Sequence, residues 1–299
     1  MNILAAANQA MSEIGLPTQT MLVGNQSTDA IQILAICQAA AQSLLKEYDW
    51  QQLETQYTWT VLSQVITGTT TAGSNVVTLS SPPSPNLDAT YQIVGTGIPQ
   101  DVYVTTCVGT TLTMSQLATA SGTVTLTFGK TKYPFPADYD RMINRTAFDK
   151  SRRWAMVGPA TPQEWEWLKS SYISTGPRIR YRLFGGYIQT WPIIATSDIL
   201  SFEYVSNGYA VDAITLANKT SFTADTDNYI WPDRLVITAV KSRYMSQRGL
   251  DSSRADAEYM QQLNLAKAYN KAADTLTMTN QRASLLIDMT NIPDSGYGL

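Results

Sequence analysis

The chain has 299 residues, of which 44% are hydrophobic and only 15% charged, and its net charge at neutral pH is -3. This composition excludes a disordered chain and a protein that binds nucleic acid through a strongly basic overall charge. The chain contains no histidine, which removes Ser-His-Asp and Cys-His catalysis and every metal site that uses imidazole.

Residues 1–60 have a helical pattern and carry one lysine against five acids, a net charge of -4. A short helix is predicted over residues 2–14, because Gly15 and Pro17 form a stop signal behind it. A second helix is predicted from residue 27 or 28 to about residue 54 on the spacing of its apolar positions.

Residues 61–130 contain only three charged side chains and are dominated by threonine, valine and glycine. Short β-branched segments separated by Gly, Pro or Ser predict a small all-β module, either a sandwich or a barrel, inserted into a helical host. The glycine-rich segment GTGIP (95–99) lies between β segments and is interpreted as a turn, because a phosphate-binding loop would be followed by a helix.

Residues 131–279 are expected to return to helices with one β hairpin. Asp138 is a candidate N-cap for a helix over 138–154, and Thr161-Pro162 opens a second, short helix. RIRYRLF and YIQTW, joined by Gly185-Gly186, predict a hairpin to which residues 199–205 add a third strand. Trp231-Pro232-Asp233 starts a helix to about residue 248, and a last helix runs from residue 251 or 252 to about 279. Residues 280–299 are expected to form an extended tail.

The two cysteines, Cys37 and Cys107, are too few for a four-thiolate zinc site or an iron–sulfur cluster, and we expect both to be free and buried. We expect no cofactor and no metal, although Asp225 and Asp227 leave a cation site open as the less favoured alternative to loop acids. Residues 1–14 lack the features of a secretory signal, and no apolar run is long enough to span a membrane.

Two sets of arginines are candidate interface residues. Alternation places three of them on one face of a strand, where they could meet phosphate, carboxylates of a neighbouring subunit or solvent: Arg178, Arg180 and Arg182. A second set shares one side of the predicted helix 138–154 with a phenylalanine, as in an interface, although a solvated face is equally open: Arg141, Arg145, Phe148 and Arg152.

The C-terminal tail carries apolar residues that must be buried, either against the chain's own sheet or on another chain. They are Leu285, Ile287, Met289, Ile292 and Tyr297. The seven tryptophans are explained by packing, with a carbohydrate platform as the alternative.

Several short segments resemble head-to-tail adaptor proteins of short-tailed bacteriophages, also known as connector or tail tubular protein A-like proteins. The segments are residues 3–17 and 46–50, YPFPADYDRMINR (133–145), YRLFGGYIQTWP (181–192), LSFEYVSN (200–207) and the helices from Trp231 onward. The inserted module also resembles Thr/Gly-rich β modules of phage tail and adaptor proteins.

The resemblance implies a structural, non-enzymatic virion protein that forms a ring, of twelve subunits in such adaptors, between the portal and the tail. It implies contacts with copies of itself, the portal, and the tail nozzle and fibre proteins, while genomic DNA passes through the channel without specific binding. It also implies production in the host cytoplasm, a place in the phage neck, and a C-terminal tail that reaches a neighbouring ring.

We therefore predict an α+β protein with a helical bundle core, a β-hairpin element and an inserted all-β module. Its predicted parts are residues 1–60 and 131–279 of the adaptor core, the module 61–130 and the tail 280–299. The alternative function is a carbohydrate- or receptor-binding tail protein that uses the module 61–130, and a His-free enzyme is the third.

Overall fold

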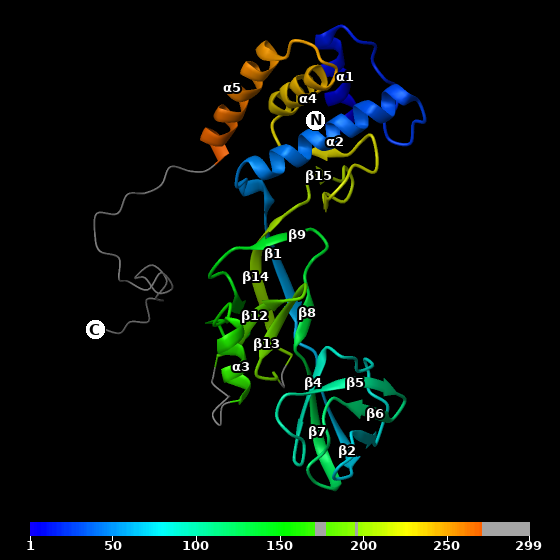
Figure 1. Ribbon diagram of the computed structural model, residues 1–299, viewed down its shortest axis with the longest axis vertical. Coiled ribbons are helices and arrows are strands. Elements are labelled where there is room, and N and C mark those ends of the chain that lie inside the picture. Colours follow the sequence, from blue (N-terminus) through cyan, green and yellow to red (C-terminus); the bar gives the residue numbers. More distant parts are fainter. Residues whose placement is uncertain (171–177, 195–196, 271–299) are drawn as a thin grey trace, which may run out of the picture.

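The computed structural model describes residues 1–170, 178–194 and 197–270. The molecule is elongated: four helices lie at one end, a β-barrel lies at the other, and two small sheets with one short helix lie between them (Figure 1). We refer to these regions as the helical part, the barrel and the middle part.

The first helix, α1 (Ile3–Ile14), has the ends that the sequence predicts. The Asn2 side chain accepts a hydrogen bond from the Ala5 N–H at 2.8 Å, and Gly15 ends the helix in the left-handed conformation with φ of 81°. Ser27 caps the second helix, α2 (Thr28–Glu47), in the same way.

The predicted end of α2 near residue 54 is wrong, because the helix stops at Glu47. The Trp50 indole N–H folds back and donates to the Leu44 carbonyl at 2.6 Å, which satisfies one of the open carbonyls of the last turn. A short 3₁₀ turn, η1 (Gln51–Leu53), follows, and the next residues form strand β1 (Glu54–Thr60).

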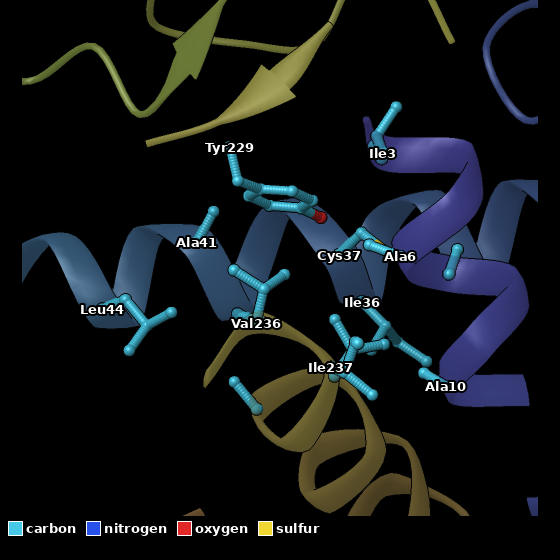
Figure 2. Close-up of a cluster of buried hydrophobic side chains, with 14 of the residues drawn as sticks. Ile3, Ala6, Ala10, Ile36, Cys37, Ala41, Leu44, Tyr229, Val236 and Ile237 are labelled. Carbon is cyan, nitrogen blue, oxygen red and sulfur yellow. The ribbon is translucent and has the colours of Figure 1, made fainter. Parts of the chain in front are cut away.

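The helix α4 (Asp233–Gln247) is the centre of the helical part and contacts α1, α2 and α5 (Ser253–Asn270). Val236 and Ile237 pack with Ile36 and Ala10 on one side of α2, while Tyr229 covers its other side (Figure 2). Tyr229 belongs to a three-stranded sheet in the order β16-β15-β17. Its strands are β15 (Ala210–Val211), β16 (Asn218–Lys219) and β17 (Asn228–Tyr229).

The predicted β module is a closed six-stranded barrel in the order β2-β3-β6-β5-β4-β7. Its strands are β2 (Ser63–Thr70), β3 (Val76–Leu79), β4 (Tyr91–Gly95), β5 (Val102–Val108), β6 (Thr111–Met114) and β7 (Gly122–Lys130). GTGIP begins at Gly95, the last residue of β4, and continues as a turn with Gly97 at φ of 78°. Leu112, Leu126 and Phe128 are among the buried residues that fill the interior.

The barrel joins the middle part through two adjacent chain crossings and a set of side-chain contacts that we call the latch. The Lys130 N–H donates to the Leu62 carbonyl at 2.8 Å, so the chain enters and leaves the barrel side by side. In the latch, Lys169 pairs with Asp101 at 2.7 Å, and the Gln189 side chain donates to the Tyr103 hydroxyl at 2.9 Å.

The middle part contains two sheets. One is ordered β1-β14-β10-β11, with β9 also paired to β14; the other is ordered β12-β13-β8. Their strands are β8 (Lys132–Pro134), β9 (Tyr139–Met142), β10 (Phe148–Asp149), β11 (Trp154–Ala155), β12 (Arg180–Phe184), β13 (Tyr187–Trp191) and β14 (Ile199–Ser206).

The helix predicted over residues 138–154 is wrong, because this stretch supplies β9, β10 and β11. The Asp138 carboxylate does not cap a helix but accepts hydrogen bonds from the Tyr204 and Ser206 hydroxyls at 2.9 and 2.7 Å. Pairing with β14, more than fifty residues further along the chain, overrides the local helical pattern.

The predicted hairpin forms as β12 and β13, with Gly185 and Gly186 both at positive φ in the two-residue turn. The third strand of its sheet is β8, whereas the strand predicted for that place, β14, belongs to the other sheet. The short helix predicted after Thr161 forms as α3 (Pro162–Ser170), and the Glu164 carboxylate accepts hydrogen bonds from the Thr161 N–H and hydroxyl.

The described residues form separate hydrophobic clusters in the helical part, the barrel and the middle part. The fold is therefore mixed α and β, and the helices build one end of the molecule instead of a core for the whole chain. Helix α5 is described to Asn270, and the remainder of its predicted range, to about residue 279, lies outside the described residues.

Candidate interaction surfaces

Two of the arginines predicted to lie on one helix side are held by ion pairs within the chain. Arg141 pairs with Asp49 and, at 2.9 Å, with Asp140. The Arg152 Nε lies 3.0 Å from the Asp198 carboxylate, whose side chain is nearly buried. The pairs with Asp49 and Asp198 join segments that are distant in sequence, whereas Asp140 is the neighbour of Arg141.

Arg145 lies with two basic residues that the helical prediction did not group with it. Arg145, Lys150 and Arg153 line a hollow of about 470 Å³ together with the half-buried Phe148. Two acids, Asp149 and Glu203, also line it, so the basic side chains outnumber the acidic ones by one. Arg145 and Arg153 are exposed, and neither makes an ion pair with a residue in the described part of the chain. We call this surface the cationic hollow.

The backbone holds these two arginines in an unusual conformation. Arg145 and Arg153 have φ of 65° and 59°, in the left-handed region that residues other than glycine rarely adopt. Such strain persists only where the surrounding structure fixes it, and it is concentrated at functional sites. The sequence signal for the hollow is that four of the nine residues between 145 and 153 are basic, and this signal does not depend on a helix.

The strand arginines divide into two groups. Arg178 and Arg180 are exposed, while Ile179 and Tyr181 between them are buried, as alternation predicts. Arg182 instead lies 4.8 Å from the centroid of the Trp165 ring, and its Nε donates to the Gln189 side chain at 2.9 Å. Arg182 therefore packs α3 against β13 beside the latch.

The acidic charge of residues 1–60 is largely balanced inside the subunit. Glu13 pairs with Arg234 and Lys241, Glu47 pairs with Lys267, and Asp49 pairs with Arg141. The net charge of this segment therefore overstates the acidic surface that it offers to a partner.

An apolar hollow of about 500 Å³ lies between α1, the start of α2 and the end of α4. Met11, Ile14, Ile33, Tyr244 and Leu250 are among its lining residues. Sequence analysis did not find it, because three elements from opposite ends of the chain build it and no single segment carries its pattern.

The acids and thiols considered for chemistry have structural surroundings. Asp225 accepts hydrogen bonds from the Leu22 and Val23 N–H groups, and Asp227 accepts them from Thr223 and Ala224, so both brace loops. Cys37 and Cys107 are free and buried.

Burial raises the pKa of the Cys37 thiol to about 12, which keeps it protonated and unreactive at neutral pH. Within the described ranges, no group of three or more Cys, Asp or Glu side chains could hold a metal ion. Five tryptophans are buried in packing contacts, whereas Trp154 and Trp167 are exposed. The tail residues Leu285, Ile287, Met289, Ile292 and Tyr297 lie outside the described residues.

Comparison with protein families decides the identity. The model of the SU10 adaptor protein family matches residues 108–286, more than half of the chain. The chain belongs to the SU10 adaptor protein family. No curated protein matches it.

Membership in this family identifies a structural adaptor protein of a phage virion, which interacts with other virion proteins. The match starts at the end of β5 and continues through the middle part and the helices α4 and α5. Among the described residues of this adaptor, none of the helices is both long and apolar enough to cross a membrane.

Proposed function

We propose that this adaptor forms a ring of identical subunits that joins the portal to the tail and continues the DNA channel. The observation that carries the proposal is the family match across residues 108–286. The resemblance of residues 3–17, 133–145 and 181–207 to adaptors of short-tailed phages supports the finer assignment to that class, with twelve subunits and tail nozzle and fibre proteins as further partners.

The cationic hollow is the proposed contact with the next subunit or with the portal. Arg145 and Arg153 present two guanidinium groups on a strained backbone, next to a phenylalanine that offers apolar area. Arginine and aromatic side chains are enriched in protein interfaces. The exposed Arg178 and Arg180 form a second candidate contact, and the tail residues 280–299 are proposed to contact a neighbouring ring.

The test is to mix the purified full-length protein with portal rings from the same phage and to image the products by electron microscopy. The proposal expects a second ring stacked coaxially on each portal, and its rotational symmetry gives the subunit count. Bare portals with free adaptor monomers would contradict the proposal and direct attention to carbohydrate binding by the barrel.

A charge-reversal variant sharpens this test. Arg145→Glu with Arg153→Glu should reduce the fraction of portals that carry a second ring. The control is Arg254→Glu, which reverses an exposed arginine at the start of α5, far from the cationic hollow. If the hollow variant assembles on portals as well as the control variant and the wild-type protein do, the hollow is excluded from the interface.

A further inference from the structure

The charged residues of the barrel are confined to the end that joins the middle part. Asp101 pairs with Lys169 in the latch, and the Lys130 ammonium lies 5.8 Å from the centroid of the Tyr133 ring. Asp88 lies within electrostatic reach of Lys130 and Lys132. Residues 63–130 contain no other charged side chain. A typical soluble domain has about 25% charged residues, so the rest of the barrel has the composition of a covered surface.

One uncharged surface crosses the strands β2, β7 and β4, and we call it the β7 face. Val65 and Val94 both lie opposite Thr127 in register, so the three side chains form a row across the strands. Val65 is 61% exposed and Val94 is 52% exposed. Thr67 and Thr125 form the next outward pair.

A second uncharged surface crosses β3, β6 and β5, and we call it the β6 face. Its rows are Val76–Thr113–Thr106 and Thr78–Thr111–Val108. Val76 and Val108 are 43% and 78% exposed. Both faces thus combine exposed valines with threonine hydroxyls, which can donate and accept hydrogen bonds across a contact.

The strand order places the two faces on opposite sides of the barrel. In the closed order β2-β3-β6-β5-β4-β7, strands β6 and β7 are three positions apart around a ring of six. A ring of identical subunits uses heterologous contacts, which need two different surfaces on each subunit. The two faces lie on opposite sides of one closed barrel and carry no charges that would have to be desolvated in a contact, so they meet this need.

We propose that the β7 face of one barrel packs against the β6 face of the barrel in a second copy of this chain, so that the barrels form a circle within the adaptor ring. This inference rests on the proposed ring. It gives the inserted module a role in subunit contact, and the latch would hold each barrel in the orientation that the contact requires.

The test places opposite charges on the two faces of the full-length protein. One variant carries Val65→Lys and Val94→Lys on the β7 face, and another carries Val76→Glu and Val108→Glu on the β6 face. Each should weaken ring assembly on portals at least tenfold, because a buried charge has no partner. A chain with all four changes should assemble better than either, since the lysine face of one copy then meets the glutamate face of the next.

The control is Gln116→Lys with Leu117→Lys, two exposed loop residues outside both faces, and it should assemble like the wild-type protein. Thermal unfolding checks that each variant folds. If the valine variants unfold, Thr67→Lys with Thr125→Lys puts the same charge on the β7 face at positions that are already exposed.

The outcomes separate this inference from the proposed function. If the β7-face variant forms rings as well as the wild-type protein does, the inference is overturned, while the proposed ring still stands. A four-change chain that assembles no better than the two-change chains would overturn the pairing of unlike faces. Failure of the wild-type protein itself to form rings on portals would overturn the proposed function first.

Discussion

The helical part and the barrel differ in how the chain builds them. The barrel is folded from one continuous segment between Ser63 and Lys130. The helical part joins α1 and α2 to α4 and α5, and the Ile3 N–H donates to the Asp227 carbonyl across more than two hundred residues. We therefore expect the barrel to fold as an independent unit, whereas the helical part requires contacts between both ends of the chain.

Removal of the barrel is the strongest test of whether the two regions fold independently. Because Leu62 and Lys130 are hydrogen-bonded neighbours, a short Gly-Ser linker can replace residues 63–129. The helical part should then keep its thermal unfolding temperature within a few degrees, as measured by circular dichroism at helical wavelengths. A shortened protein without stable helices would show that the two regions depend on each other.

The same difference explains what the sequence could predict. An all-β module, either a sandwich or a barrel, is predictable because residues 61–130 have few charges and many β-branched residues. The helices α1 and α4 are predictable from local start and stop signals. Residues 138–154 have a helical pattern but form strands, because their partner, β14, starts at Ile199. Pairing with a distant strand leaves no mark on a local pattern.

The candidate interface residues also divide into those that a single segment predicts and those that depend on a distant partner. The alternation of Arg178 and Arg180 with buried residues was visible in the sequence, because it depends on one strand. The partners of Arg141 and Arg152 are Asp49 and Asp198, which no spacing rule connects to them. The apolar hollow between α1, α2 and α4 was invisible for the same reason.

Core truncations in the two regions should act separately. Phe128→Ala empties a fully buried position in the barrel, and Trp50→Ala does so in the helical part. Each should cost about 3–5 kcal/mol of stability in its own region. Amide hydrogen exchange should show loss of protection in the altered region only. Equal loss in both regions after either change would contradict independent folding.

The buried thiol of the helical part predicts a dependence on alkaline pH. Burial raises the Cys37 pKa from 9.0 to about 12, so the folded protein keeps a proton that the unfolded chain releases. The free energy of unfolding is therefore unaffected by this thiol below pH 9. It falls by about 1.4 kcal/mol per pH unit as the pH rises from 9 towards 12.

Urea unfolding between pH 8 and pH 11 measures this effect. The Cys37→Ala variant should show a shallower loss of stability with pH than the wild-type protein, whatever its absolute stability. Identical pH slopes for the two proteins would show that the thiol does not ionise on unfolding in this range.

Loss of one hydrogen bond in the latch should have the smallest effect on stability. Tyr103→Phe removes the hydroxyl that accepts a hydrogen bond from Gln189, at a cost of about 0.5–1.5 kcal/mol. Hydrogen exchange should increase at the junction of β7 and β8, while the barrel interior stays protected. Tyr269→Phe, at an 84% exposed position on α5, serves as the control and should change nothing.

A three-dimensional electron cryomicroscopy reconstruction of the adaptor bound to its portal tests the account most directly. We predict one ring of adaptor subunits in which each barrel touches the next, with Val65 and Val94 of one copy facing Val76 and Val108 of its neighbour. Barrels that stand apart with both faces open to solvent would contradict the account.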